Sequence, residues 1–147
     1  MARSQRVFFR IGAWACVVTS LIHLAGQFAG PPGPKNPTEK TLFELLTTYQ
    51  RDFGAGFRRT TSDFLNGFSL CFSLFLAWLG VLCLLAARRH GGDARFMTAM
   101  SRACAVFSAA VLTISVVYFF LPPTVCLAVV FLGFAGAALS PAGGVSA

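Results

Sequence analysis

The chain has 147 residues, of which 56% are hydrophobic and 12% are charged. A soluble domain carries about 25% charged residues, and the mean hydropathy here is +0.70. This composition excludes a disordered chain, a collagen-like chain and a disulfide-rich secreted scaffold, and it argues against a water-soluble globular enzyme. We expect a single membrane domain over residues 1–147.

Basic residues outnumber acidic residues by 12 to 5, which gives a formal net charge of +7. In a soluble protein this excess would suggest a nucleic-acid partner. Here the arginines and lysines stand between long apolar runs, and the sequence contains no basic patch interleaved with aromatic residues. We therefore predict no nucleic-acid partner, and we interpret the basic residues as those that hold loops on the cytoplasmic side of a membrane.

Four apolar segments are long enough, or nearly long enough, to cross a bilayer, which takes about 20 residues. They are residues 11–30, 64–87, 103–121 and 124–139. Pro122 and Pro123 divide the last long run, because proline breaks the interior of a helix, and the short connection implies an antiparallel pair. Backbone groups in lipid must be satisfied within each segment, so the spans are helices. The expected fold is all-α, a bundle of four transmembrane helices.

The arginines predict the orientation of these spans. The N-terminal tail and the loop between the second and third spans are rich in arginine and contain one acidic residue, Asp93; their arginines are Arg3, Arg6, Arg10, Arg88, Arg89, Arg95 and Arg102. Residues 31–63 hold five basic and four acidic residues, a net charge of +1. We expect a multi-pass protein of a cell inner membrane, with both termini in the cytoplasm and residues 31–63 outside. The first span is interrupted by His23 and Gln27 and lacks a good cleavage site, so we expect it to be retained.

The outer loop at residues 31–63 contains a second kind of helix. Asn36, Pro37 and Glu39 form a helix-start signal, with a capping residue, a residue suited to the first helical position and a side chain that returns a hydrogen bond. Apolar residues then recur at helical spacing, at Leu42, Phe43, Leu45, Leu46 and Tyr49. We predict an amphipathic helix over residues 37–52 that ends at the glycines of residues 54–56. It would lie on the outer membrane surface or cap the bundle; a plain surface helix without a ligand is the alternative.

Polar side chains inside the spans are the strongest functional indication, because ionisable and amide groups are costly in lipid. Some of them share helix faces: His23 and Gln27 are four residues apart, and Asp63 and Asn66 are three apart. Tyr118 lies in the outer third of the third span. The predicted polar pocket at the outer end of the bundle consists of His23, Gln27, Asp63, Asn66 and Tyr118. Asp52, Arg58 and Arg59 in the outer loop are further candidate ligand-binding residues.

Three roles are open for this pocket. Hydrogen bonds between polar groups also hold helices together in lipid, so the pocket can be purely structural. As a binding site it would take an apolar small molecule, such as a lipid, a quinone or an isoprenoid-like molecule, with phenylalanines as walls, or it would pack against a membrane partner or a second copy of the chain. As an intramembrane enzyme, an isomerase, cyclase or hydrolase of an apolar substrate, the protein would use His23 and Asp63 in acid–base roles.

The five cysteines all lie in predicted spans, and none belongs to a CxxC pair; they are Cys16, Cys71, Cys83, Cys104 and Cys126. Cysteine is a common small apolar core residue, and no histidine lies in a span at the depth of Cys16, Cys83 and Cys104. We predict no metal site and no cofactor. The sequence contains no P-loop, GxGxxG, GxSxG or HExxH motif, so ATP-driven transport, zinc hydrolysis and serine hydrolysis have no support.

Small residues four apart predict where helices approach closely. Three such pairs occur, one each in the first, second and fourth spans: Gly12 with Cys16, Ser73 with Ala77, and Gly133 with Ala137. We assign these pairs to packing and not to chemistry.

Several segments together resemble those of one family. They are the arginine-led first span with His23, the helix start at residues 36–39, the segment DFLNGFSL at residues 63–70 and the segment YFFLPP at residues 118–123. With these segments, over nearly its whole length, the chain resembles a family of small, uncharacterised bacterial four-helix integral membrane proteins. The resemblance implies the fold and the membrane location. It implies no activity and no catalytic residue.

Overall fold

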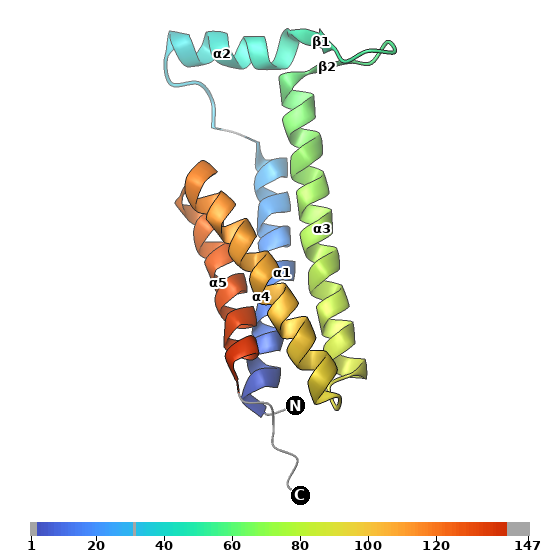
Figure 1. Cartoon of the computed structure of the whole chain (residues 1–147). Helices are drawn as coiled ribbons and strands as arrows, with labels where there is room; N and C mark the ends of the chain where they lie inside the picture. The colour runs from blue at the N-terminus through green and yellow to red at the C-terminus, as the bar shows by residue number, and fades with distance from the viewer. Residues whose placement is uncertain (1–2, 31, 141–147) are drawn as a thin grey trace, which may run out of the picture.

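A computed structural model of the chain describes residues 3–30 and 32–140. In chain order these residues form α1 (Arg3–Ala29), α2 (Pro37–Thr48), β1 (Gln50–Asp52), β2 (Arg58–Thr60), α3 (Thr61–Arg89), α4 (Ala94–Tyr118) and α5 (Leu121–Leu139) (Figure 1). Among the described helices, α1, α3, α4 and α5 are long and apolar enough to cross a membrane. The expected all-α fold with four spans, and with a short helix between the first two, is therefore confirmed.

The four spanning helices begin before the apolar runs that predicted them. α1 begins at Arg3 and α4 at Ala94, about two turns before the predicted starts at residues 11 and 103. α4 begins there because Asp93 caps it, accepting the backbone N–H of Phe96 at 3.0 Å. Hydropathy marks the part of a helix that lies in hydrocarbon, whereas capping residues decide where the helix itself starts. The predicted break before α5 is confirmed, and its two prolines lie in the first turn, where proline is tolerated.

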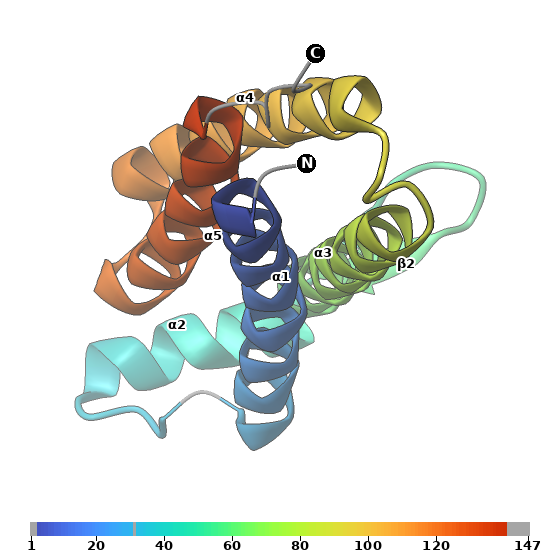
Figure 2. The same ribbon diagram turned by 90° about the horizontal axis from the view of Figure 1, so that it is seen from below.

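The four spans pack in the spatial order α3, α1, α5, α4. α1 packs against both α3 and α5, and α4 packs against α5, as Figure 2 shows along the bundle. The α1–α5 crossing depends on glycine: a Cβ atom on Gly133 would lie 2.5 Å from the Gly12 backbone nitrogen. A Cβ atom on Gly80 of α3 would lie 2.8 Å from the Ala13 carbonyl oxygen of α1. Gly12 and Gly133 thus make the predicted close approach, and on α3 a further close approach to α1 is made by Gly80.

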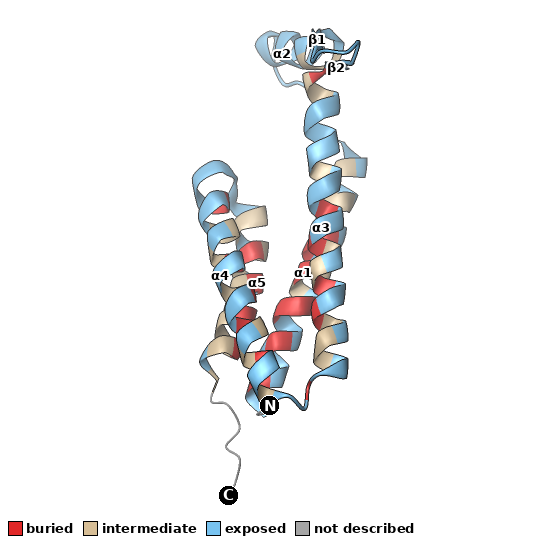
Figure 3. Ribbon diagram, turned by 45° about the vertical axis from the view of Figure 1, so that its right-hand side comes forward, coloured by how far each residue is buried: buried red, intermediate tan, exposed pale blue. Residues whose placement is uncertain are grey.

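The core lies in the half of the bundle that contains the start of α1 and the end of α5, which we call the terminal end. Buried residues gather there, whereas most residues in the upper part of α3 are exposed (Figure 3). Phe9 and Phe134 meet edge to face with ring centroids 5.5 Å apart. The core also contains Met97 and three cysteines, Cys16, Cys83 and Cys104.

The opposite end, which we call the hairpin end, is formed by α2, β1 and β2. α2 lies crosswise over the start of α3 (Figure 1). The predicted helix start is confirmed: Asn36 Oδ1 accepts the Glu39 N–H at 2.8 Å, and Glu39 Oε2 accepts the Lys35 N–H at 2.7 Å. No residue of α2 is buried, so its Leu and Phe side chains are available to the membrane surface.

The predicted end of this helix, at residue 52, is wrong. α2 ends at Thr48, and Gln50–Asp52 pairs antiparallel with Arg58–Thr60, with Gln50 opposite Thr60. From the sequence, the glycines at positions 54 and 56 are expected to end the helix. They have φ angles of +91° and +79°, which suit glycine in the tight turn of a hairpin. Residues 50–52, which the apolar spacing assigned to the helix, are therefore held by the backbone hydrogen bonds of the hairpin.

Candidate functional site

The predicted pocket residues His23, Gln27 and Asn66 lie along the contact of α1 with α3, toward the hairpin end. The Gln27 side-chain amide donates to Asn66 Oδ1 at 2.6 Å. Nearer the core, the Ser20 hydroxyl donates to the Ser73 carbonyl oxygen at 2.7 Å. Both pairs fit a single antiparallel register of α1 against α3. We call this stretch, from Ser20 and Ser73 to Gln27 and Asn66, the α1–α3 seam.

His23 is half-buried between these two hydrogen bonds. Its ring meets that of Phe72 edge to face, with centroids 5.4 Å apart and an interplanar angle of 81°. This contact packs the imidazole of α1 against α3. A neutral imidazole has one donor and one acceptor nitrogen, so His23 can bind a polar group of a third molecule while Phe72 packs against its ring.

The Gln27–Asn66 bond leaves hydrogen-bonding capacity in both amides. Each side-chain amide has two donor hydrogens and a carbonyl oxygen with two lone pairs. In the part of the chain that the structure describes, neither the Gln27 carbonyl nor the Asn66 amino group forms a further side-chain hydrogen bond. The seam therefore offers both hydrogen-bond donors and hydrogen-bond acceptors.

Asp63, a predicted catalytic residue, lies at the start of α3. Its Oδ2 accepts the Thr60 N–H at 3.1 Å, and its own N–H donates to Thr60 Oγ1 at 3.1 Å. The two residues form a capping box, which typically contributes about 1 kcal/mol to helix stability. The carboxylate thus takes part in starting α3.

Tyr118 lies at the end of α4, where 78% of its surface is exposed. In residues 3–30 and 32–140, no hydrogen bond or ring contact joins it to His23 or Asn66. The polar contact at its end of the bundle is between Ser115 and Thr124, whose hydroxyl oxygens are 2.9 Å apart and link α4 to α5. The sequence predicts Tyr118 in the pocket from its expected depth in the membrane. Depth alone does not specify which helices are neighbours.

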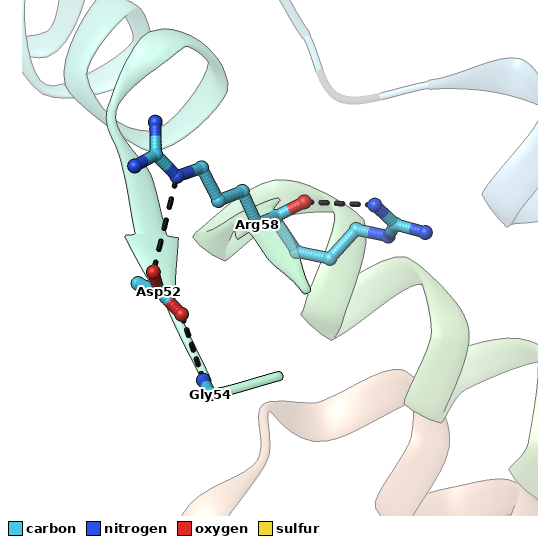
Figure 4. Close-up of polar contacts among 4 residues, drawn as sticks. Asp52, Gly54 and Arg58 are labelled. Atoms are coloured by element: carbon cyan, nitrogen blue, oxygen red, sulfur yellow. Dashed lines mark hydrogen bonds and ion pairs between the residues drawn. The ribbon is translucent and has the colours of Figure 1, made fainter. Parts of the chain in front are cut away.

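The candidate residues of the outer loop lie in the hairpin. Arg58 Nε lies 3.9 Å from Asp52 Oδ2, Asp52 Oδ1 accepts the Gly54 N–H at 2.8 Å, and Arg59 donates to the Arg58 carbonyl oxygen at 2.7 Å (Figure 4). Asp52 and Arg58 also line a hollow of about 670 Å³ together with Tyr49 and Phe53. An exposed ion pair contributes at most about 1 kcal/mol to the stability of a fold. The side chains of Asp52 and Arg58 remain more than half exposed, so both charges are accessible to a ligand.

Two polar features of the core were missed from the sequence. Gln5 is fully buried, and its amide donates to Thr98 Oγ1 on α4 at 3.1 Å, while its Oε1 has no partner among the described residues. Its spacing of four from Phe9 would have placed it on the buried face of α1. Cys83 and Cys104 bring their sulfur atoms within 3.7 Å, between α3 and α4. Of the described histidine, cysteine and acidic residues, no three are grouped so that they can hold a metal ion.

Comparison of the chain with protein-family models, with curated proteins and with solved structures gave no match. The nature of the protein therefore follows from its own helices. Four long apolar helices packed together make it a small polytopic membrane protein that resides in a lipid bilayer and crosses it four times.

Proposed function

We propose that the protein binds an apolar molecule with a polar head, such as a lipid, a quinone or an isoprenoid-like alcohol, and holds that head at the α1–α3 seam. The observation that supports this most directly is the Gln27–Asn66 hydrogen bond beside His23. It places two amides with spare donors and acceptors next to an imidazole, in a helix pair that faces lipid.

Aromatic rings on α3 supply an apolar surface next to these polar groups. Phe53 of the hairpin stacks on Phe64, and Phe64 meets Phe68 edge to face, with centroids 5.6 and 4.6 Å apart. Phe72, which touches His23, continues the same spacing of four along α3. The apolar body of a ligand can lie along these rings while its polar head reaches the seam.

The enzymatic alternative needs Asp63 as the acid–base partner of His23. The register of the two hydrogen bonds places His23 level with Leu70, seven residues along α3 from Asp63. At 1.5 Å per residue this is about 10 Å, beyond direct hydrogen bonding. The Asp63 carboxylate also accepts the Thr60 amide. We therefore favour binding over proton transfer.

Native mass spectrometry of the full chain in mild detergent tests this proposal with three probes: phosphatidylethanolamine, a quinone with a short isoprenoid tail, and farnesol. We expect a one-to-one adduct with at least one probe, weakened at least tenfold by Asn66→Leu. Thr113→Val, which removes a hydroxyl from exposed α4 surface, is the matched control and should leave binding unchanged. His23→Asn keeps a hydrogen-bonding side chain and should weaken the adduct only slightly.

Two results would overturn the proposal. One is the absence of an adduct with all three probes, and the other is equal weakening by Asn66→Leu and Thr113→Val. Conversion of a probe to a product of different mass, abolished by His23→Asn, would instead establish the enzymatic alternative, because asparagine does not titrate near neutral pH.

A further inference from the structure

A groove runs along the outside of the contact between α1 and α5. Its volume is about 660 Å³, and its walls include Val7, Trp14, Val18 and Ile22 of α1 and Val129 of α5. With Ile11, which also lines the groove, these side chains of α1 recur every three or four residues, so they form one stripe along the helix. Trp14 is 55% exposed and Ile22 57% exposed, so the stripe is open to the surrounding lipid.

The groove is long enough for a complete acyl chain. Val7 and Ile22 are 15 residues apart, which is about 22 Å of helix. One leaflet contributes about 15 Å to the hydrocarbon core, half of its roughly 30 Å thickness. A chain that enters at the terminal end can therefore remain in contact with α1 and α5 throughout its own leaflet.

Arg10 lines the groove at the terminal end, and no acidic residue of the described part of the chain lines the groove with it. Neither α1 nor α5 contains an acidic residue. Asp93, the acidic residue of the loop at this end, accepts the Phe96 amide in the cap of α4. The ion pair formed among the described residues, Arg58 with Asp52, lies at the hairpin end. Among the described residues, therefore, no acidic side chain pairs with Arg10, and its guanidinium is available to an anionic group from the lipid.

We propose that this groove binds one anionic phospholipid, with its phosphate on Arg10 and an acyl chain along Trp14, Val18 and Ile22. A guanidinium suits a phosphate because it donates two parallel hydrogen bonds. Basic pockets between transmembrane helices bind anionic headgroups in this way. The proposed site lies on α1 and α5 and does not depend on the ligand proposed for the α1–α3 seam.

A second copy of the chain fits the groove less well than a lipid. Two copies in one membrane, related by a two-fold axis along the membrane normal, would bring the same face of α1 together at the same depth. Arg10 would then lie close to Arg10 of the other copy at the level of the headgroups, where the two like charges repel each other. An anionic lipid neutralises the same charge.

The test is titration of the delipidated full chain with dioleoyl phosphatidylglycerol and dioleoyl phosphatidylcholine, followed by native mass spectrometry. The two lipids share acyl chains and differ in net charge. We expect one molecule of phosphatidylglycerol bound at least tenfold more tightly than phosphatidylcholine. Arg10→Gln should reduce this preference to less than threefold, and Arg10→Lys should retain most of it. Arg102 is an exposed arginine about as far from the start of α4 as Arg10 is from the start of α1. Arg102→Gln should leave the preference for phosphatidylglycerol unchanged.

A second pair of variants tests the apolar part of the site. Val18→Trp fills the groove and should abolish retention of both lipids, whereas Val106→Trp adds the same bulk to exposed α4 surface and should not. Equal binding of the two lipids by the wild-type protein would overturn the proposal, as would equal effects of Arg10→Gln and Arg102→Gln. A dimer that Val18→Trp dissociates would show that a second copy occupies the groove, which also overturns it.

Discussion

Gln27 and Asn66, 39 residues apart in the sequence, are joined by a side-chain hydrogen bond of 2.6 Å that links α1 to α3. The bond lies on the hairpin side of the buried core, where most of α3 is exposed. Ser20 and Ser73 repeat the connection nearer the core, at 2.7 Å. Polar contacts therefore continue the α1–α3 contact beyond the region where apolar side chains are buried.

A double-mutant cycle measures the Gln27–Asn66 contact. We expect Gln27→Leu and Asn66→Leu to show a coupling energy of about 1 kcal/mol in the free energy of unfolding, because hydrogen bonds between transmembrane helices typically contribute about 0.6 to 2 kcal/mol. Unfolding in mixed micelles, followed by circular dichroism, gives the values. The control cycle combines Gln27→Leu with Thr113→Val on α4 and should be additive. A coupling near zero between Gln27 and Asn66 would contradict the contact.

The α1–α5 crossing predicts opposite effects for two glycine-to-alanine substitutions. Gly133→Ala places a Cβ atom 2.5 Å from the nitrogen and 2.6 Å from the Cα of Gly12, and backbone atoms there cannot rotate away. We expect a loss of about 1–3 kcal/mol in the free energy of unfolding, as is typical of overpacking. Gly67→Ala meets nothing within 4 Å and should stabilise α3 by about 0.5–1 kcal/mol, because alanine favours helix. Equal effects of the two substitutions in the same unfolding assay would refute this packing.

The Cys83–Cys104 contact predicts a specific cross-link. Their sulfur atoms are 3.7 Å apart, so a small movement of the side chains allows a disulfide between α3 and α4. Iodine, which enters lipid, should oxidise the two thiols to a disulfide while it is reduced to iodide and two protons are released. Peptide mapping should find Cys83 joined to Cys104 in the wild type and in the Cys71→Ser and Cys126→Ser variants. A cross-link that is absent, or that forms equally well to Cys71, would contradict the geometry.

The distribution of arginines predicts the orientation in the membrane. Reporter fusions after Lys35 and after Gly92 should report opposite compartments, with the Gly92 fusion in the cytoplasm, because arginine-rich short loops remain there. Replacing Arg88, Arg89 and Arg95 by glutamine should weaken this preference. If both fusions report the same compartment, the four-span arrangement is wrong.

The sequence by itself determined the four spans of this protein and the start of α2. A span is recognised by the hydropathy of about 20 consecutive residues, and a helix start by the few residues around a cap such as Asn36. Both depend on neighbours in the chain, so local patterns predicted four spans, the start of α2 and the proline break before α5. The hairpin was missed because its strands are held by each other, through pairs such as Gln50 with Thr60.

The short connection predicted that α4 and α5 are neighbours, as they are, but only the tertiary structure decided where α1 and α3 lie relative to them. Topology sets how deep a residue lies in the membrane, and depth alone suggested that Tyr118 joins His23 and Asn66. Lateral arrangement and rotation depend on side-chain fit, as where Gly133 packs on the backbone of Gly12. That fit places α1 between α3 and α5, so Gln27 reaches Asn66 while α4, with Tyr118, packs on the far side of α5. The same fit forms the groove at Arg10, which no spacing of residues within one helix predicts.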